Sequence, residues 1–138
     1  MTEPDPMPGS QPEKPLVLIC EDEVLVRMLI SDLLQDGGFK VIEAKNVAEA
    51  LRVLEARPDI QVLFTDVEMP PGPNGYELAQ QVCERWPYIQ IIISSGRALP
   101  VAGDMPDCAV FLRKPWTAAS LTQHVQEAAD RAMKPTAK

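Results

Sequence analysis

The sequence has little of what a nucleic-acid-binding or membrane protein requires. Its 138 residues include 13 Lys and Arg against 20 Asp and Glu, which gives a net charge of −7. No basic stripe is available to displace the counterions of a phosphate backbone, which argues against nucleic acid as a partner. No apolar run approaches the length of a membrane span, and residues 1–15 have no apolar signal-peptide core. We therefore expect a cytoplasmic protein with no membrane contact.

Histidine and cysteine are also scarce. His124 is the only histidine, which weakens hypotheses based on a histidine-assisted nucleophile or on a metal site with several histidines. The three cysteines, Cys20, Cys83 and Cys108, are an odd number and have neither metal-ligand nor redox spacing. We expect them to be reduced and mostly buried in the core.

The length predicts one domain between two short tails. Residues 1–14 are rich in proline and polar residues and are predicted to be a disordered N-terminal tail. The domain is predicted over residues 15–133, and residues 134–138 are predicted to be a flexible C-terminal tail. No output domain is expected after the last predicted helix.

Predicted strands and helices alternate along residues 15–133. The predicted strands lie at 15–20, 39–44, 60–66, 88–94 and 108–114, and the predicted helices at 23–38, 46–58, 74–87 and 117–133. Because the strands are near-continuous apolar runs separated by helices, the pattern predicts a five-stranded parallel sheet covered on both faces. This is the doubly wound α/β class.

Helical spacing and capping residues define the predicted helices. The apolar residues at helical spacing are Val24, Leu25, Met28, Leu29 and Leu33 in the first helix, Val47, Ala50, Leu51 and Leu54 in the second, and Leu78, Val82 and Trp86 in the third. Asn46 and Thr117 are predicted N-caps. The segment 96–107, where a further helix is expected, contains Pro100, Gly103 and Pro106, so we expect a loop with at most one or two helical turns.

Polar residues follow the predicted strands at one edge of the sheet, where ligands bind in open α/β folds. They are Glu21 and Asp22 after the first strand, Asp66 at the end of the third, Ser94 and Ser95 after the fourth, and Lys114 after the fifth. Clustered carboxylates repel one another, and a hard cation such as Mg²⁺ or Mn²⁺ relieves that repulsion. With a lysine and a hydroxyl nearby to bind phosphate oxygens, a central carboxylate can act as a nucleophile on phosphorus.

These motifs, in this order, resemble the receiver domain of bacterial two-component response regulators (CheY-like). They are Glu21-Asp22, Asp66, Ser95 and the segment "FLRKPW", and the resemblance covers about residues 15–133. It implies the flavodoxin-like strand order 2-1-3-4-5. It also implies a stand-alone signalling protein that accepts a phosphoryl group from a sensor histidine kinase or a histidine phosphotransfer protein, and an unknown downstream protein target.

The resemblance also implies a role for each matched residue. Asp66 matches the phosphoacceptor, and the predicted metal ligands are Glu21, Asp22, Asp66 and the backbone carbonyl of Glu68. Ser95 matches the hydroxyl that contacts the phosphoryl group, Lys114 the lysine before the cis-proline position (Pro115), and Phe111 the aromatic switch position. Ser94 remains the alternative to Ser95, and simple packing the alternative to a switch at Phe111.

Three functions remain open. The first is a Mg²⁺-dependent phosphoacceptor that acts as a switch, shuttle or sink, with at most intrinsic autophosphatase activity. The second is a phosphatase of the haloacid dehalogenase type, but Glu68 stands where that family has Asp, on the third strand rather than the first, and the chain has no room for a cap. The third is a protein-interaction module that does not use phosphate, which the unusual 96–107 segment leaves open.

Overall fold

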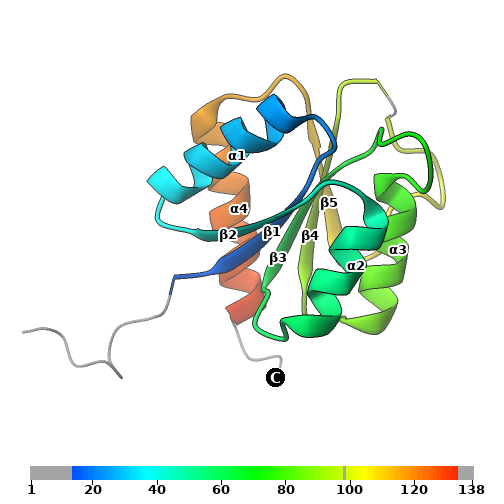
Figure 1. Cartoon of the computed structure of the whole chain (residues 1–138), viewed down its shortest axis with the longest axis horizontal. Helices are drawn as coiled ribbons and strands as arrows, with labels where there is room; N and C mark the ends of the chain where they lie inside the picture. Colours follow the sequence, from blue (N-terminus) through cyan, green and yellow to red (C-terminus); the bar gives the residue numbers. More distant parts are fainter. Residues whose placement is uncertain (1–13, 98, 134–138) are drawn as a thin grey trace, which may run out of the picture.

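Five parallel strands form the centre of the molecule (Figure 1). The computed structural model describes residues 14–97 and 99–133. The strands are β1 (Leu16–Cys20), β2 (Lys40–Ala44), β3 (Val62–Asp66), β4 (Gln90–Ser95) and β5 (Ala109–Arg113). Their order in the sheet is β2-β1-β3-β4-β5, which confirms the predicted α/β fold and strand order. The tails predicted at 1–14 and 134–138 lie outside the described residues, apart from Lys14.

The register of the strands aligns the residues that follow them. Cys20 on β1 pairs with Thr65 on β3, so Glu21 and Asp66, the next residues along the chain, lie side by side. Asp66 in turn pairs with Ser94 on β4. The amide of Lys114 donates to the carbonyl of Ser95 at 3.0 Å, immediately after the β4–β5 pairing. The loops that follow β1, β3, β4 and β5 therefore begin close together at one edge of the sheet.

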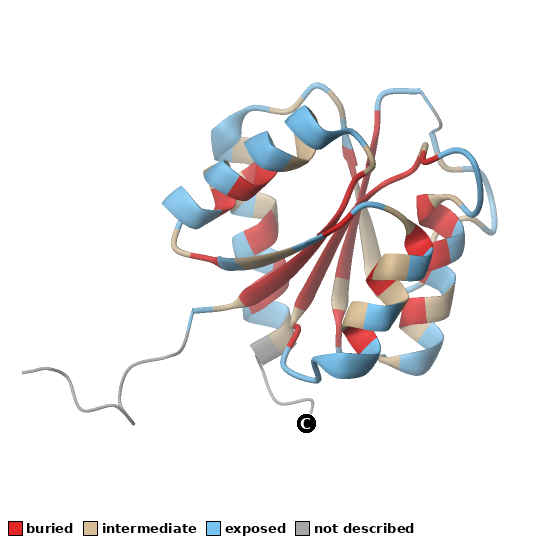
Figure 2. Cartoon of the chain, viewed as in Figure 1, coloured by how far each residue is buried: buried red, intermediate tan, exposed pale blue. Residues whose placement is uncertain are grey.

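Helices cover both faces of the sheet, as predicted. Helices α1 (Val24–Asp36) and α4 (Ala118–Met133) pack on one face, and α2 (Val47–Ala56) and α3 (Gly75–Arg85) on the other (Figure 1). The central strands are buried from both sides, as the red strands between the helices in Figure 2 show. No helix in the described ranges is long and apolar enough to cross a membrane.

Side-chain caps set the starts of three helices. Asn46 accepts from the amide of Glu49 at 2.8 Å, and Thr117 accepts from the amide of Ser120 at 3.0 Å, so both predicted N-caps are confirmed. Asn74 and Glu77 form a reciprocal capping box at the start of α3. These local signals explain why the helix starts could be predicted closely from the sequence.

Helix α1 forms as predicted, but four of the five apolar residues at helical spacing on it are exposed. Val24, Leu25, Met28 and Leu29 are between 50% and 80% exposed. The helix instead buries Ile30, Ser31 and Leu34 against the sheet. Because α1 is apolar on more than one side, periodicity alone could not decide which side faces the core. The result is an exposed apolar face on α1.

The connection from β4 to β5 contains no helix in its described residues, 96–97 and 99–108, as predicted. Instead, it is attached to α3. The Gln80 side chain donates to the carbonyls of Gly103 and Asp104, both at 3.0 Å. A disulfide joins Cys83 to Cys108.

This disulfide corrects the prediction of three reduced thiols. Only Cys20 is free, and it is buried. The two cysteines are 25 residues apart in sequence, and this spacing does not indicate a disulfide. The pairing depends instead on how α3 packs beside the start of β5.

Candidate functional site

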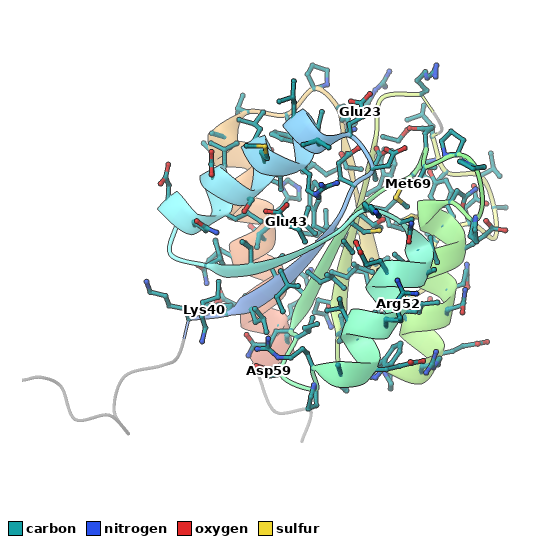
Figure 3. All side chains as sticks on the ribbon, in the orientation of Figure 1. Glu23, Lys40, Glu43, Arg52, Asp59 and Met69 are labelled. Atoms are coloured by element: carbon teal, nitrogen blue, oxygen red, sulfur yellow. A yellow bond between two sulfur atoms is a disulfide. The ribbon has the colours of Figure 1, made fainter. Side chains whose placement is uncertain are left out.

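A hollow of about 320 Å³ lies at the carboxyl edge of the sheet. Figure 3 shows this end at the top, where the labelled Glu23 and Met69 lie, with Lys40 and Asp59 toward the opposite end. The residues that line it come from the ends of β1, β3, β4 and β5: Glu21, Asp22, Glu23, Asp66, Glu68, Pro70, Arg97 and Lys114. The structure thus brings together most of the residues that the sequence predicted for one site.

Three carboxylates converge in this hollow. One side-chain oxygen each from Glu21, Asp22 and Asp66 lies within 4.8 Å of the others. Glu21 and Asp66 are almost entirely buried, with 2% and 4% of their surface exposed. Buried carboxylates this close together destabilise one another in their ionised forms, so the site favours a positive charge among them.

The pKa values reflect this crowding. Burial raises the pKa of Glu21 to about 7, and the nearby charge of Asp66 adds to the shift while Lys114 opposes it. Burial also raises the pKa of Asp66, against the effect of its hydrogen bond with Lys114. For Lys114, burial acts to lower the pKa, but the hydrogen bond and charge of Asp66 outweigh burial and raise it.

Lys114 forms ion pairs with two of the three acids. Its Nζ is 2.8 Å from Oδ1 of Asp66 and 3.9 Å from Oε1 of Glu21. The peptide bond between Lys114 and Pro115 is cis, as the family resemblance implied for that position. The single ammonium therefore offsets only part of the charge of three carboxylates.

A divalent cation fits the residues present. Oε1 of Glu21 is buried and has no hydrogen-bond partner among the described residues. An orphaned carboxylate oxygen of this kind is costly unless something binds it. Oxygen-only donors in a carboxylate-rich pocket match the preferences of Mg²⁺ and Mn²⁺. The three carboxylates thus form a suitable site for such an ion.

The two serines at the end of β4 point to different partners. Oγ of Ser94 accepts from the indole nitrogen of Trp116 at 3.2 Å. Oγ of Ser95 donates to Oε2 of Glu68 at 2.8 Å and accepts from the amide of Arg97 at 3.0 Å. Because Glu68 lines the hollow, Ser95 is the serine connected to the acidic site.

The loop after Asp66 is held by a close backbone approach. The amide of Gly75 donates to the carbonyl of Val67 at 3.0 Å. A Cβ atom at position 75 would overlap the carbonyl oxygen of Asp66, so only glycine fits there. This contact fixes the start of α3 against the end of β3, and with it the backbone that carries Asp66.

Phe111 lies apart from the hollow. It is half-buried on β5, opposite Ile93, and packs against the core on the α2–α3 side. The sequence, in turn, did not predict the side-chain role of Glu68 or the presence of Glu23 and Arg97 in the hollow. The only sequence feature that could have indicated these residues is that each lies within two positions of a predicted site residue: Asp22, Asp66 or Ser95.

Comparisons with known proteins agree with this architecture. The family model for the response regulator receiver domain matches residues 17–126 of this chain. A protein-glutamate methylesterase/protein-glutamine glutaminase from Hahella chejuensis is 34% identical over 60% of this chain and 24% of its own length. Chemotaxis protein CheY1 from Helicobacter pylori is 28% identical over 80% of this chain and 93% of its own.

A solved structure of a receiver protein from Sinorhizobium medicae is also similar. Its TM-score is 0.80 at 27% identity, covering 87% of this chain and 98% of that one. The chain spans only 22% to 57% of the length of several other curated relatives, which include transcriptional regulators. The similarity is therefore to a domain that also occurs within longer proteins.

Proposed function

The chain belongs to the response regulator receiver domain family, and we propose that it accepts a phosphoryl group on Asp66 from a phosphohistidine donor. Receiver domains are generally signalling modules rather than enzymes, and they are phosphorylated by histidine kinases or histidine phosphotransfer proteins. The observation that carries the proposal is the ion pair between Lys114 and Asp66 within the cluster of three acids.

Asp66 provides the nucleophile. A carboxylate oxygen forms a bond to phosphorus while the bond from phosphorus to the donor imidazole nitrogen breaks, and the leaving electron pair stays on that nitrogen. Lys114 is close enough to stabilise charge on the phosphoryl oxygens as the group arrives. The Ser95 hydroxyl is the proposed donor to a further phosphoryl oxygen. Catalysis on this scaffold comes from positioning and charge stabilisation.

A bound Mg²⁺ would be held by Glu21, Asp22 and Asp66, with the backbone carbonyl of Glu68 as a further ligand; Mn²⁺ suits the same donors. When bound, the ion neutralises carboxylate charge and orients a phosphoryl oxygen. The orphaned oxygen of Glu21 supports this assignment. Phe111 remains a proposed switch residue, since it lies on β5 directly before the segment that carries Lys114.

The surface next to the hollow suits the donor protein. An apolar groove of about 260 Å³ is lined by Val26, Leu29, Lys114, Pro115 and Trp116. Lys114 borders both this groove and the acidic hollow, so a protein that delivers a phosphoryl group to Asp66 must cover part of the groove. The exposed apolar face of α1 continues from it. We assign this surface to docking of the phosphohistidine protein.

Labelling with acetyl phosphate and Mg²⁺ tests the proposal. Intact mass should show a gain of one phosphoryl group in the wild type, and Asp66→Asn should abolish it. Asp32→Asn, which changes an exposed acid on α1, is the matched control and should label normally. Asp22→Ala should weaken Mg²⁺ binding, whereas Lys114→Ala should leave the metal ligands in place.

Other results would favour the competing functions. Labelling that persists in the Asp66→Asn variant would contradict the assignment of the phosphoacceptor. Sustained turnover of a phosphomonoester would favour a phosphatase. Partner binding that is equally tight in wild type and Asp66→Asn, with or without phosphate, would favour an interaction module independent of phosphorylation.

A further inference from the structure

The side chain of Glu68 accepts a hydrogen bond from the Ser95 hydroxyl, which the proposed function assigns to the phosphoryl group. Ser95 is fully buried, and its Oγ donates to Oε2 of Glu68 at 2.8 Å. A serine hydroxyl has a single proton to donate. The same oxygen accepts a hydrogen bond from the backbone amide of Arg97 at 3.0 Å. In this structure the proton of Ser95 is therefore directed to Glu68.

A phosphoryl group on Asp66 requires the same proton. Both the phosphoryl group and the Glu68 carboxylate are anions that accept hydrogen bonds, and one hydroxyl proton cannot be donated fully to both. The two anions also repel each other across the hollow, which Asp66 and Glu68 both line. Binding of the phosphoryl group to Ser95 must therefore displace Glu68.

The position of Glu68 permits that displacement. Glu68 is only half-buried, whereas its partner Ser95 is fully buried. A carboxylate at the rim of the hollow can rotate into solvent at small desolvation cost. The serine cannot move in the same way, because it lies at the end of β4 within the sheet. Of the two partners, Glu68 is the one that can leave.

We propose that the carboxylate of Glu68 competes with the phosphoryl group on Asp66 for the Ser95 hydroxyl, and that it thereby weakens the phosphorylated state. Glu68 is a positioning residue here, because it acts through Ser95. This inference rests on the proposed function, and it concerns the side chain of Glu68 rather than the backbone carbonyl assigned to the metal. Replacement of the side chain should leave that carbonyl in place.

The test measures the affinity of beryllofluoride, a mimic of the phosphoryl group, by calorimetry at saturating Mg²⁺. Glu68→Gln keeps the size of the side chain and removes its charge, and should tighten binding roughly fivefold, the scale of one like charge at a partly exposed site. Glu23→Gln is the matched control, since Glu23 lines the same hollow but it is Glu68 that accepts the Ser95 proton. Its gain should be smaller.

A double-mutant cycle separates competition for the hydroxyl from general electrostatics. In an S95A background, the gain from Glu68→Gln should fall to that of Glu23→Gln, whose own gain should not change. In an S95T background, which keeps a hydroxyl, the larger gain from Glu68→Gln should return. This rescue also covers the case in which S95A disturbs the strand end.

Three results would overturn the inference. The first is unchanged or weaker beryllofluoride binding by Glu68→Gln. The second is an equal gain from Glu68→Gln with and without a hydroxyl at position 95. The third is weaker Mg²⁺ binding by Glu68→Gln, which would make the side chain part of the metal site. If no protein binds beryllofluoride, wild type included, the proposed function itself fails, and the inference with it.

Discussion

Two of the connections that leave the carboxyl edge of the sheet are held in different ways. The connection from β3 to α3, residues 67–74, is fixed by its backbone: the amide of Gly75 donates to the carbonyl of Val67, and a Cβ at position 75 would overlap the carbonyl oxygen of Asp66. The connection from β4 to β5 carries no helix in its described residues and is held by side chains of α3. Those side chains are Gln80 and Cys83.

One of these connections belongs to the acidic site, and the other is attached mainly outside it. The first connection follows Asp66 directly and carries Glu68, so it cannot shift without moving the acidic site. The second begins next to Ser95 and Arg97, yet its far end, at residues 103–108, is attached through groups outside the hollow. The second connection can therefore be loosened independently of the site, and the following predictions test this separation.

The largest effect is expected at Gly75. Gly75→Ala places a methyl group against the backbone of Asp66, so the free energy of unfolding should fall by at least about 3 kcal/mol. Gly103→Ala in the other connection is the matched control. Gly103 has a φ of 92° and open space around it, so the cost there is backbone strain of about 1 kcal/mol. Urea unfolding of both variants measures the difference. Equal losses would remove the distinction between the two connections.

Opening the disulfide should have the next largest effect. The Cys83–Cys108 bond closes a loop with a sequence separation of 25, so reduction should cost about 3 kcal/mol of stability through the gain in entropy of the unfolded chain. Hydrogen exchange should quicken in residues 99–108 but not in residues 67–74. The Cys83→Ser/Cys108→Ser variant is the control, because a reductant should not affect it. An unfolding midpoint that reductant leaves unchanged in the wild type would contradict the prediction.

The acidic site should make stability depend on pH in the absence of metal. Burial raises the pKa of Glu21 from 4.5 to about 7, so the folded protein binds this proton more tightly than the unfolded chain. The free energy of unfolding should therefore fall as the pH rises from about 4.5 through 7, by about 2 kcal/mol. Urea unfolding at pH 5 and pH 8 with a chelator measures this loss.

Two controls define the source of that pH dependence. Glu21→Gln should flatten it, because the titrating group is gone. Mg²⁺ at pH 8 should restore stability to the wild type, since binding to the folded state alone is stabilising. A wild-type protein that is equally stable at both pH values would show that Glu21 titrates normally.

The smallest effect is expected at Gln80. Gln80→Ala removes two hydrogen bonds to the carbonyls of Gly103 and Asp104, at a cost of about 1 kcal/mol. Glu84→Ala, an exposed change on the same helix, is the control. Hydrogen exchange in residues 99–108 should quicken in the first variant alone. Faster exchange in residues 67–74 as well would indicate that the two connections are coupled.

The sequence predicted the strands and the helix starts because these depend on local signals, whereas the order of the strands in the sheet was implied by the family resemblance. Strand residues are apolar runs, and Asn46 and Thr117 cap the helices that follow them. The convergence of Glu21, Asp66 and Lys114 followed from the same pattern, since parallel strands end at one edge. The site could be predicted because its residues are adjacent to strand ends.

The exposed face of α1 could not be predicted in the same way. Leu25 and Ile30 are both apolar residues of one helix, yet one is 80% exposed and the other fully buried. The choice depends on how α1 is rotated against the sheet, where Arg27 bonds the carbonyl of Glu21 at 2.8 Å and the carboxylate of Glu43 at 3.0 Å. One partner follows β1 and the other lies on β2, so they leave no periodic signal in α1.

The amino-acid sequence by itself determined the order of strands and helices, and therefore which acids, hydroxyl and lysine share one edge of the sheet. It could do so because hydrophobic periodicity and capping act over a few residues. Only the tertiary structure decided which side of α1 is exposed, that Cys83 meets Cys108, and that Glu68 binds Ser95. Those outcomes depend on the packing of elements distant in sequence, which side-chain identity alone does not specify.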